Sequence, residues 1–224
     1  LIRWKNAREG MIYPSDFIPL FEKNGMICRL DLYVFEHVCK LMDLRKKEKK
    51  EIFPVSVNLS RAHLKTGSME FVDHIIALKE KYHIPDGILE IEMTESIMIE
   101  DHQLPAIKKM IDTFHENGIL CSLDDFGYGF SSLGILKVLD IDVIKLDRKF
   151  FMEENEKTWF IVSNFIELAH GLGIKTVAEG IEYEDQVRHL KEADCDMIQG
   201  YFYGKPMPLS EFILWYEKNR GGDL

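Results

Sequence analysis

The chain has 224 residues, 46% of them hydrophobic and 29% charged, a composition that excludes collagen-like, low-complexity and wholly disordered proteins. With 28 Lys and Arg against 38 Asp and Glu, the formal net charge is −10, which argues against binding a nucleic acid polymer through its phosphates. A small phosphate ligand remains possible where metal ions or a few placed cations offset the charge.

Apolar residues switch repeatedly between strand and helix spacing. In chain order they predict a strand at Ile52–Leu59, a helix near 71–82, a strand at Ile88–Met93, a helix near 104–114, strands at Ile119–Leu123 and Ile141–Leu146, a helix near 159–168, strands at Ile174–Ala178 and Met197–Tyr201, and a helix near 212–216. Gly118 is expected to cap the second helix, and Ser210 is expected to be the N-cap of the last.

Near-continuous apolar strands that alternate with amphipathic helices are typical of a parallel sheet covered by helices. About six such units favour a single α/β domain over residues 1–224, a (β/α)₈ TIM-like barrel, rather than two doubly wound domains. A complete barrel typically has about 250 residues, so we expect this chain to lack an N-terminal strand.

Polar residues stand where the predicted strands end. In chain order they are Asn58, Glu92 with Glu95, Asp124 with Asp125, Lys145, Glu179 and Gln199. In a (β/α)₈ barrel the carboxyl ends of the strands surround one mouth, where active sites are built. Several carboxylates and an amide oxygen, without His or Cys, form the hard oxygen site that Mg²⁺ or Mn²⁺ prefers.

Each of these residues also has a purely structural interpretation. Adjacent Asp124 and Asp125 before Phe126-Gly127 are common in turns, and Glu92 alone could be a surface residue of an edge strand. Lys145 lies in an apolar strand and could simply form a buried ion pair. The joint pattern of polar residues at successive strand ends is what favours a functional site.

The cysteines and the lengths of the apolar runs indicate the cellular compartment of the protein. The sequence has 4 cysteines, far apart and without a C-x-x-C motif, which indicates reduced thiols in a reducing compartment. No apolar run approaches the roughly 20 residues of a membrane span, and no signal peptide follows Leu1. We expect a cytoplasmic domain, or the cytoplasmic part of a membrane-anchored protein, cut from a longer chain.

Six segments together resemble one known family. They are FPVSVNLS, LEIEMTES, SLDDFGYGFSSL, IDVIKLDRKF, TVAEGIE and MIQGYFYGKPMP. In this order they are similar to the signatures of EAL-type cyclic di-GMP phosphodiesterases, and the resemblance extends from Leu1 to about Phe212. The family's fold is a (β/α)₈ barrel with an irregular first strand.

The resemblance implies two divalent metal ions, Mg²⁺ or Mn²⁺. The first would be held by Asn58, Glu92 and Asp124, and the second by Asp124, Asp125 and Glu179. It also implies roles for six further positions. Lys145 would orient the attacking water, Gln199 would lie near that water, Arg3 would contact a phosphate, Pro206 would pack near a guanine, and Glu182 with Glu95 would anchor the loop 125–132.

The chain begins at the leucine of the E-A-L motif, so the motif's glutamate, a ligand of the first metal in the family, is not in this sequence. The resemblance implies hydrolysis of cyclic di-GMP to linear pGpG by a homodimer, fused to a cyclase-like or sensor domain. Two other functions stay open. One is an inactive receptor or protein-interaction module that binds the dinucleotide without hydrolysis, and the other is an unrelated metal-dependent (β/α)₈ hydrolase.

Overall fold

The computed structural model describes residues 2–6, 8, 10–66, 69–94, 104–127, 133–153 and 155–219. The chain divides into two compact units, an N-terminal unit of residues 2–145 and a C-terminal unit of residues 146–224. The parallel strands are hydrogen-bonded neighbours in chain order, β3-β4-β5-β6-β7-β8, and the boundary between the units falls within β6. The predicted α/β class with a parallel sheet is therefore confirmed.

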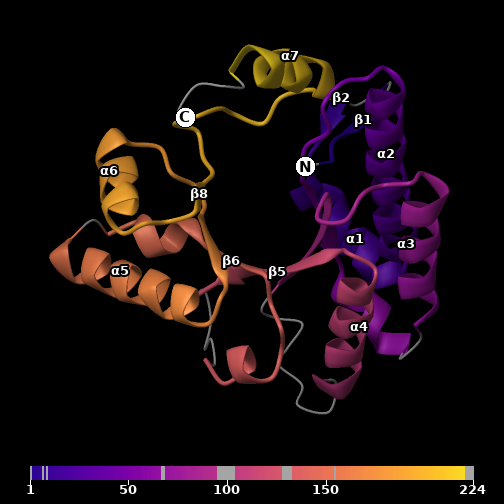
Figure 1. Ribbon diagram of the computed structural model, residues 1–224. Coiled ribbons are helices and arrows are strands. Elements are labelled where there is room, and N and C mark those ends of the chain that lie inside the picture. Colours follow the sequence, from indigo (N-terminus) through magenta and orange to yellow (C-terminus); the bar gives the residue numbers. More distant parts are fainter. Residues whose placement is uncertain are drawn as a thin grey trace. The chain divides into compact units, whose positions relative to one another are not determined.

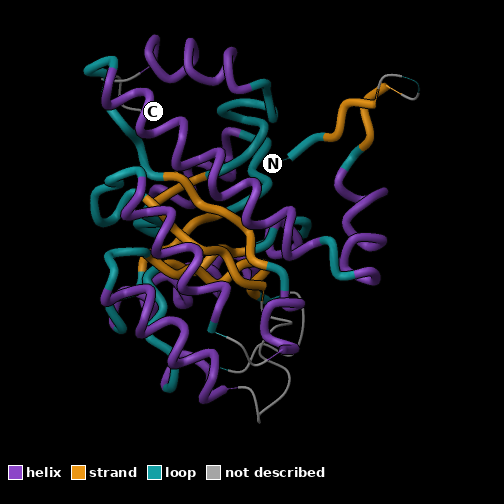
Figure 2. Tube along the Cα trace, turned by 90° about the vertical axis from the view of Figure 1, so that its right-hand side faces the viewer, coloured by secondary structure: helices purple, strands orange, loops and turns teal. Residues whose placement is uncertain are grey.

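The N-terminal unit holds most of the described strands (Figure 1). Its elements are β1 (Trp4–Asn6), β2 (Gly10–Ile12), α1 (Pro14–Asn24), α2 (Ile27–Lys47), β3 (Val55–Leu59), the 3₁₀ helix η1 (Arg61–Thr66), α3 (Glu70–Lys81), β4 (Leu89–Thr94), α4 (Leu104–Glu116), β5 (Leu120–Phe126), η4 (Ile135–Lys137) and β6 (Val143–Leu146). The short antiparallel pair β1–β2 stands apart from the parallel strands of this unit, to which α1 and α2 connect it (Figure 2).

The helices of this unit pack through faces that the sequence spacing creates. In α4 the side chains of Ile107, Met110, Ile111 and Phe114 are buried, because residues three and four apart share one helix face. After α4 ends, Gly118 adopts φ 66, a left-handed conformation that glycine reaches without steric cost, as the predicted cap requires. This turn leads into β5, the strand that carries Asp124 and Asp125.

The C-terminal unit contains η5 (Arg148–Phe151), α5 (Glu156–Gly171), β7 (Lys175–Ala178), α6 (Glu184–Glu192), β8 (Met197–Ile198) and α7 (Leu209–Asn219). The buried face of α5 is formed by Val162, Ile166 and Ala169, and this helix contacts β7. Two predicted boundaries are wrong. Ser210 lies inside α7 rather than at its N-cap, because the helix already begins at Leu209, and β8 ends before Gln199.

One hydrogen-bonding pattern occurs in both units, where a strand begins. In the N-terminal unit, His115 Nε2 lies 2.8 Å from Asp142 Oδ2, which also accepts a 2.7 Å hydrogen bond from the Cys121 backbone N–H. In the C-terminal unit, His170 and the Thr176 backbone N–H approach the Asp196 carboxylate in the same way, each at 2.8 Å. Each aspartate thus ties the end of a helix to the first residues of the following strand.

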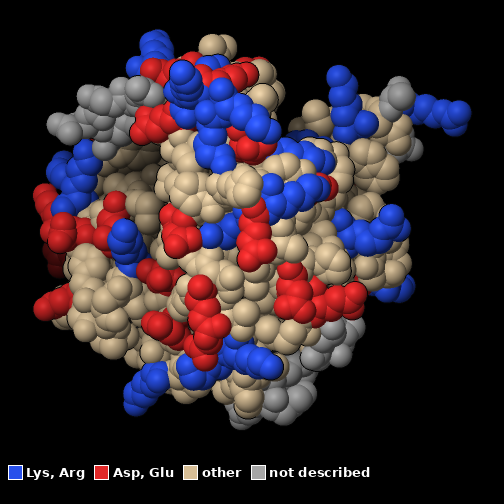
Figure 3. All heavy atoms as spheres, turned by 45° about the vertical axis from the view of Figure 1, so that its right-hand side comes forward, with Lys and Arg blue, Asp and Glu red and all other residues tan. Residues whose placement is uncertain are grey.

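The surface in Figure 3 carries acidic and basic side chains interspersed on the face displayed. Although acidic residues outnumber basic ones by 38 to 28 in the sequence, many lysines and arginines lie among the acidic side chains on this face. None of the helices in the described part of the chain is both long enough and apolar enough to cross a membrane.

Candidate functional site

Asn58 and Glu92 face each other on neighbouring parallel strands. β3 and β4 pair in a register that sets Asn58 opposite Glu92, and the Asn58 side-chain amide donates a 2.9 Å hydrogen bond to Glu92 Oε2. Glu92 is only 5% exposed, although it carries a carboxylate. A carboxylate removed from water in this way needs charged or hydrogen-bonding partners.

Lys145 supplies the positive charge. Its side chain lies on β6, itself buried, and Nζ is 2.8 Å from Glu92 Oε1 and 3.2 Å from Asp124 Oδ1. The predicted strand-end residues Asn58, Glu92, Asp124 and Lys145 are therefore brought together within the N-terminal unit. Two carboxylates here share one ammonium group, which leaves an excess of negative charge.

Asp124 is the residue whose hydrogen bonding is incomplete. Its Oδ1 atom is buried and lies within ionic range of Lys145. Even so, this atom receives no hydrogen bond from the described residues. Buried polar atoms are nearly always satisfied in folded proteins, so an exception points to a missing partner. An oxygen-rich cluster with an unsatisfied carboxylate oxygen fits a hard divalent cation such as Mg²⁺ or Mn²⁺.

Glu90, on the same strand as Glu92, is partly buried. Burial raises the pKa of the Glu90 carboxyl, and a hydrogen bond with the Ser122 side chain offsets part of that rise. Glu90 and Glu92 are two residues apart on β4, so their side chains point to the same face of the sheet. Charges in such surroundings interact more strongly than they would in water, because the local dielectric constant is low.

Asp125 has an unusual backbone conformation. Its φ of 57 places it in the left-handed region, and its side chain is exposed at the end of β5. Non-glycine residues adopt this conformation rarely, and such strain is concentrated at functional sites. The side chain of Asp125 is more exposed than that of Asp124, yet a carboxylate oxygen of each residue lies within 4.8 Å of the other, close enough to share a cation.

In the C-terminal unit, Glu179 and Gln199 each follow directly after a strand, β7 and β8 respectively. The Gln199 backbone N–H donates a 2.8 Å hydrogen bond to the Ala178 carbonyl, which holds the two strand ends together. A glycine comes after each residue. A Cβ on Gly200 would lie 2.0 Å from the Ile181 carbonyl oxygen, so this position tolerates no side chain.

The other predicted site residues have varied surroundings. The Arg3 guanidinium lies 5.6 Å from the centre of the Tyr13 ring, and Arg3 Nη1 donates a hydrogen bond to the Ile2 carbonyl. Pro206 is exposed in the segment before α7. The Glu182 backbone N–H donates to Gln186 Oε1 at the start of α6. Glu95 and residues 128–132 of the predicted loop lie outside the described residues.

Sequence reasoning missed two buried polar residues near the end of β3, Asp31 and His63, which are 9% and 7% exposed. They are 32 positions apart in the sequence, and their side chains lie 3.0 Å apart. A lone histidine after a strand and a lone aspartate in a helix carry no signal by themselves. Only their contact, which the sequence does not display, reveals them.

The sequence profile of a family described as "EAL domain" matches residues 1–206. The chain is 34% identical over 223 residues to "Cyclic di-GMP phosphodiesterase NbdA" of Pseudomonas aeruginosa, an alignment that covers 96% of this chain and 28% of the relative. It is 32% identical to "Bifunctional diguanylate cyclase/cyclic di-GMP phosphodiesterase MucR" of the same species, over 95% of this chain and 31% of that protein. The chain thus spans about a third or less of these relatives.

Among solved structures, the chain is similar to "PaMucR Phosphodiesterase, c-di-GMP complex", with a TM-score of 0.85 and 32% sequence identity. That similarity covers 95% of this chain and 85% of the other. The comparisons confirm the family resemblance found in the sequence and the predicted fold class, the TIM-like barrel of these domains.

Proposed function

Because the chain belongs to the EAL domain family, we propose that it hydrolyses cyclic di-GMP to linear pGpG with Mg²⁺ or Mn²⁺ as cofactor. The observation that carries this proposal is the cluster of Asn58, Glu92, Asp124 and Lys145, which combines hard oxygen ligands with a fixed ammonium group. Two relatives named as cyclic di-GMP phosphodiesterases support the same substrate.

The proposed metal ligands fall into two sets that share one residue. Asn58, Glu92 and Asp124 would hold one ion, and Asp124, Asp125 and Glu179 would hold the other. The unsatisfied Oδ1 of Asp124 supports its place in both sets. Divalent ions held there would lower the pKa of a bound water and offset the negative charge of a phosphodiester.

The side chains of the protein would do the positioning. Lys145, held in place by two carboxylates, would orient the attacking water and face the phosphate with a preorganised positive charge. Gln199 would fix that water from the end of β8, where a backbone hydrogen bond already holds the residue. Arg3 would contact a phosphate, and Pro206 would pack near a guanine base.

The remaining parts of the proposal concern the loop and the whole protein. Glu95 and Glu182 would anchor the loop 125–132, which would contribute to a homodimer interface. We place the domain in the cytoplasm, fused to a cyclase-like or sensor domain. The name of the relative MucR, which joins a diguanylate cyclase with a phosphodiesterase, supports such a fusion.

The direct test is to incubate the full chain with cyclic di-GMP and Mg²⁺ or Mn²⁺ and to follow pGpG by chromatography. We expect turnover that a chelator abolishes and that added metal restores. Binding of the dinucleotide without turnover would replace the proposal with a receptor. Turnover of another phosphodiester, without binding of cyclic di-GMP, would favour a different metal-dependent hydrolase.

A second test addresses the ligand set through Asp125. Changing Asp125→Asn should lower the affinity or the number of Mn²⁺ ions bound, measured by calorimetric titration, because one anionic ligand is lost. Asp112→Asn is a matched control, since Asp112 is an exposed carboxylate paired with Lys108 on α4. Unchanged Mn²⁺ binding in the Asp125 variant would reduce Asp125 to a turn residue.

A further inference from the structure

The backbone directly after Asn58 is held by a buried side chain from another element. The Ser60 backbone N–H donates a 3.0 Å hydrogen bond to Asp31 Oδ2, and His63 Nε2 lies 3.0 Å from the same oxygen atom. Asp31 belongs to α2, whereas His63 belongs to η1, the turn that follows β3. One carboxylate oxygen thus closes the segment between Ser60 and His63 into a tethered turn.

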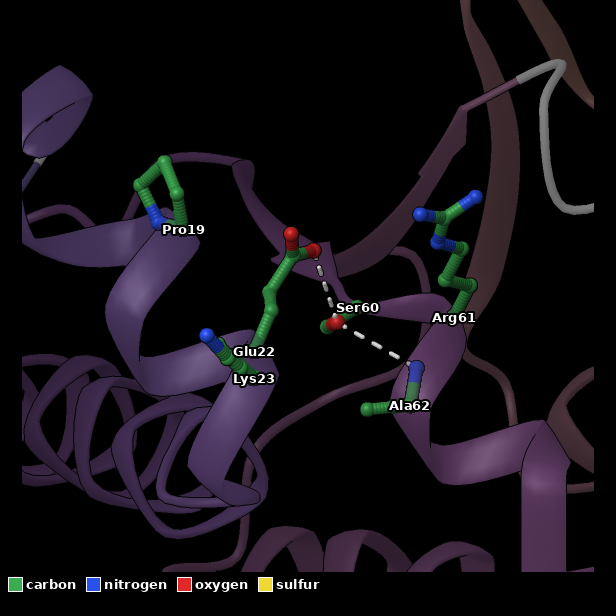
Figure 4. Close-up of a pocket in the computed structure, with 6 residues that line it drawn as sticks. All are labelled: Pro19, Glu22, Lys23, Ser60, Arg61 and Ala62. Atoms are coloured by element: carbon green, nitrogen blue, oxygen red, sulfur yellow. Dashed lines mark hydrogen bonds between the residues drawn. The ribbon is translucent and has the colours of Figure 1, made fainter.

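A second carboxylate reaches the same serine. The Ser60 hydroxyl lies 3.3 Å from Glu22 Oε1 on α1 and accepts a 3.3 Å hydrogen bond from the Ala62 backbone N–H. Figure 4 shows the Glu22 carboxylate pointing toward Ser60, beside the pocket that these residues line. Glu22, Asp31, Ser60 and His63 form what we call the Ser60 clamp.

The clamp is anchored in the body of the N-terminal unit. The ring of His63 lies 3.7 Å from that of Phe71 on α3, with 38° between the ring planes. Helices α1, α2 and α3 therefore all contribute to holding the end of β3. Because this many elements meet at one turn, a small shift of the turn would have to disturb several of them.

From this arrangement we propose that Asp31 is a positioning residue for Asn58. The inference rests on the proposed function, in which the Asn58 side chain holds a metal ion. Asn58 is exposed and comes two residues before Ser60, at the end of a strand. The tether at Ser60 stops this strand end from fraying, and so keeps the Asn58 amide in line with Glu92, its 2.9 Å partner.

The geometric demand on such a site is strict. Binding constellations must be held within about 0.5 Å of the productive arrangement by residues that are themselves locked in place. Loss of an outer partner of a metal ligand typically weakens metal affinity or activity by about 10–100-fold. Asp31 acts here through one turn of backbone, so we expect an effect of about 10-fold, at the lower end of that range.

The experiment compares Mn²⁺ affinity, measured by calorimetric titration of the full chain without substrate, in four proteins. These are the parent, Asp31→Ala, Asn58→Ala and the double variant. Asp31→Ala and Asn58→Ala should each weaken Mn²⁺ binding about 10-fold. In the double variant, Asp31→Ala should add nothing, because its effect acts through Asn58.

A matched control separates positioning from mere folding. Asp142 also accepts hydrogen bonds from a backbone N–H and a histidine side chain. It lies before β6, and the proposed ligands lie at the other ends of the strands. Asp142→Ala should lower the melting temperature and leave Mn²⁺ affinity unchanged. Should Asp31→Ala fold poorly, Asp31→Asn retains the size and one acceptor oxygen for the Ser60 N–H, and its Mn²⁺ affinity should lie between those of Asp31→Ala and the parent.

The outcomes are distinguishable. If Asn58→Ala leaves Mn²⁺ binding unchanged, the ligand set of the proposed function is wrong. If Asn58→Ala weakens binding while Asp31→Ala and Asp31→Asn do not, or if the effects add fully in the double variant, the positioning role of Asp31 is overturned and the proposed function stands.

Discussion

Two aspartates in the N-terminal unit, Asp124 and Asp142, differ in how far the described residues satisfy their carboxylates by hydrogen bonds. Asp142 lies before β6, where one of its oxygens receives hydrogen bonds from His115 and from a backbone N–H. Asp124 lies near the carboxyl end of β5, where its buried Oδ1 is 3.2 Å from Lys145 but receives no hydrogen bond from the described residues. One oxygen of Asp142 thus has two protein partners, whereas the buried oxygen of Asp124 has no hydrogen bond from the described residues.

This difference separates a structural carboxylate from a functional one. A carboxylate whose bonds are all made within the fold stabilises that fold, and another ligand could bind it only at the expense of those bonds. A buried carboxylate that is left partly unsatisfied raises the energy of the unliganded protein and gains by binding a cation. The number of carboxylates at a strand end matters less than how completely the protein satisfies them.

The largest effect should come from Lys145→Ala, which removes the cation from between Glu92 and Asp124. Loss of one preorganised charge should slow hydrolysis about 100–1000-fold. The metal-free variant should also lose about 3–5 kcal/mol of stability, because two buried carboxylates lose their partner. Added Mn²⁺ should then raise its melting temperature more than that of the parent, as binding to the folded state predicts.

The control for that experiment is Lys108→Ala. Lys108 pairs with Asp112 on the exposed side of α4, where such a pair contributes about 0–1 kcal/mol. A rise in melting temperature with Mn²⁺ that is equal in parent, Lys108→Ala and Lys145→Ala would show that Lys145 does not compete with the metal for the carboxylates. Near-normal pGpG production by Lys145→Ala would remove its proposed catalytic role.

A smaller effect, confined to stability, is expected for Asp142→Ala. The change leaves the Cys121 N–H and His115 without their acceptor, at a cost of about 1–3 kcal/mol in the free energy of unfolding. The rate of hydrolysis per folded molecule should not change. Chemical denaturation and the chromatographic assay, carried out on the same preparation, measure the two quantities separately. A loss of activity larger than the loss of folded protein would contradict the structural role.

The strand ends were the part of the site most open to prediction from the sequence. Apolar runs that stop at a polar residue located β3, β4 and β5 to within a few positions, and the parallel arrangement then follows from the helices between them. The register of β3 and β4 sets Asn58 opposite Glu92, and the Lys145 ammonium group then joins Glu92 to Asp124.

Other parts could not be predicted in this way. The pair β1–β2 has three-residue strands, too short for a periodic pattern to show. Helix α2 extends from Ile27 to Lys47, a region for which the apolar spacing predicted no helix. The Ser60 clamp and the two histidine–aspartate pairs depend on contacts between residues far apart in the chain, such as Asp31 with His63. Such pairs follow from the packing of whole elements, which local spacing does not encode.

The smallest expected effect concerns the pH dependence of stability. It involves Asp196, which in the C-terminal unit links the end of α5 to the start of β7. Its burial raises the pKa of the carboxyl, but hydrogen bonds from His170 and Thr176 outweigh that influence, so the pKa lies below the ordinary value. A carboxyl whose pKa is lowered by folding contributes stability that is complete above the ordinary value, near pH 4, and is lost as the pH falls through the lowered value.

The variant Asp196→Asn should therefore be less stable than the parent at pH 6, and the difference should shrink as the pH falls below about 4. Thermal unfolding at a series of pH values measures this difference. Asp185→Asn is a suitable control, because Asp185 forms an exposed pair with Arg188 on α6. A difference between parent and Asp196→Asn that stays constant from pH 6 to pH 2 would mean that the Asp196 side chain acts through its shape and not its charge.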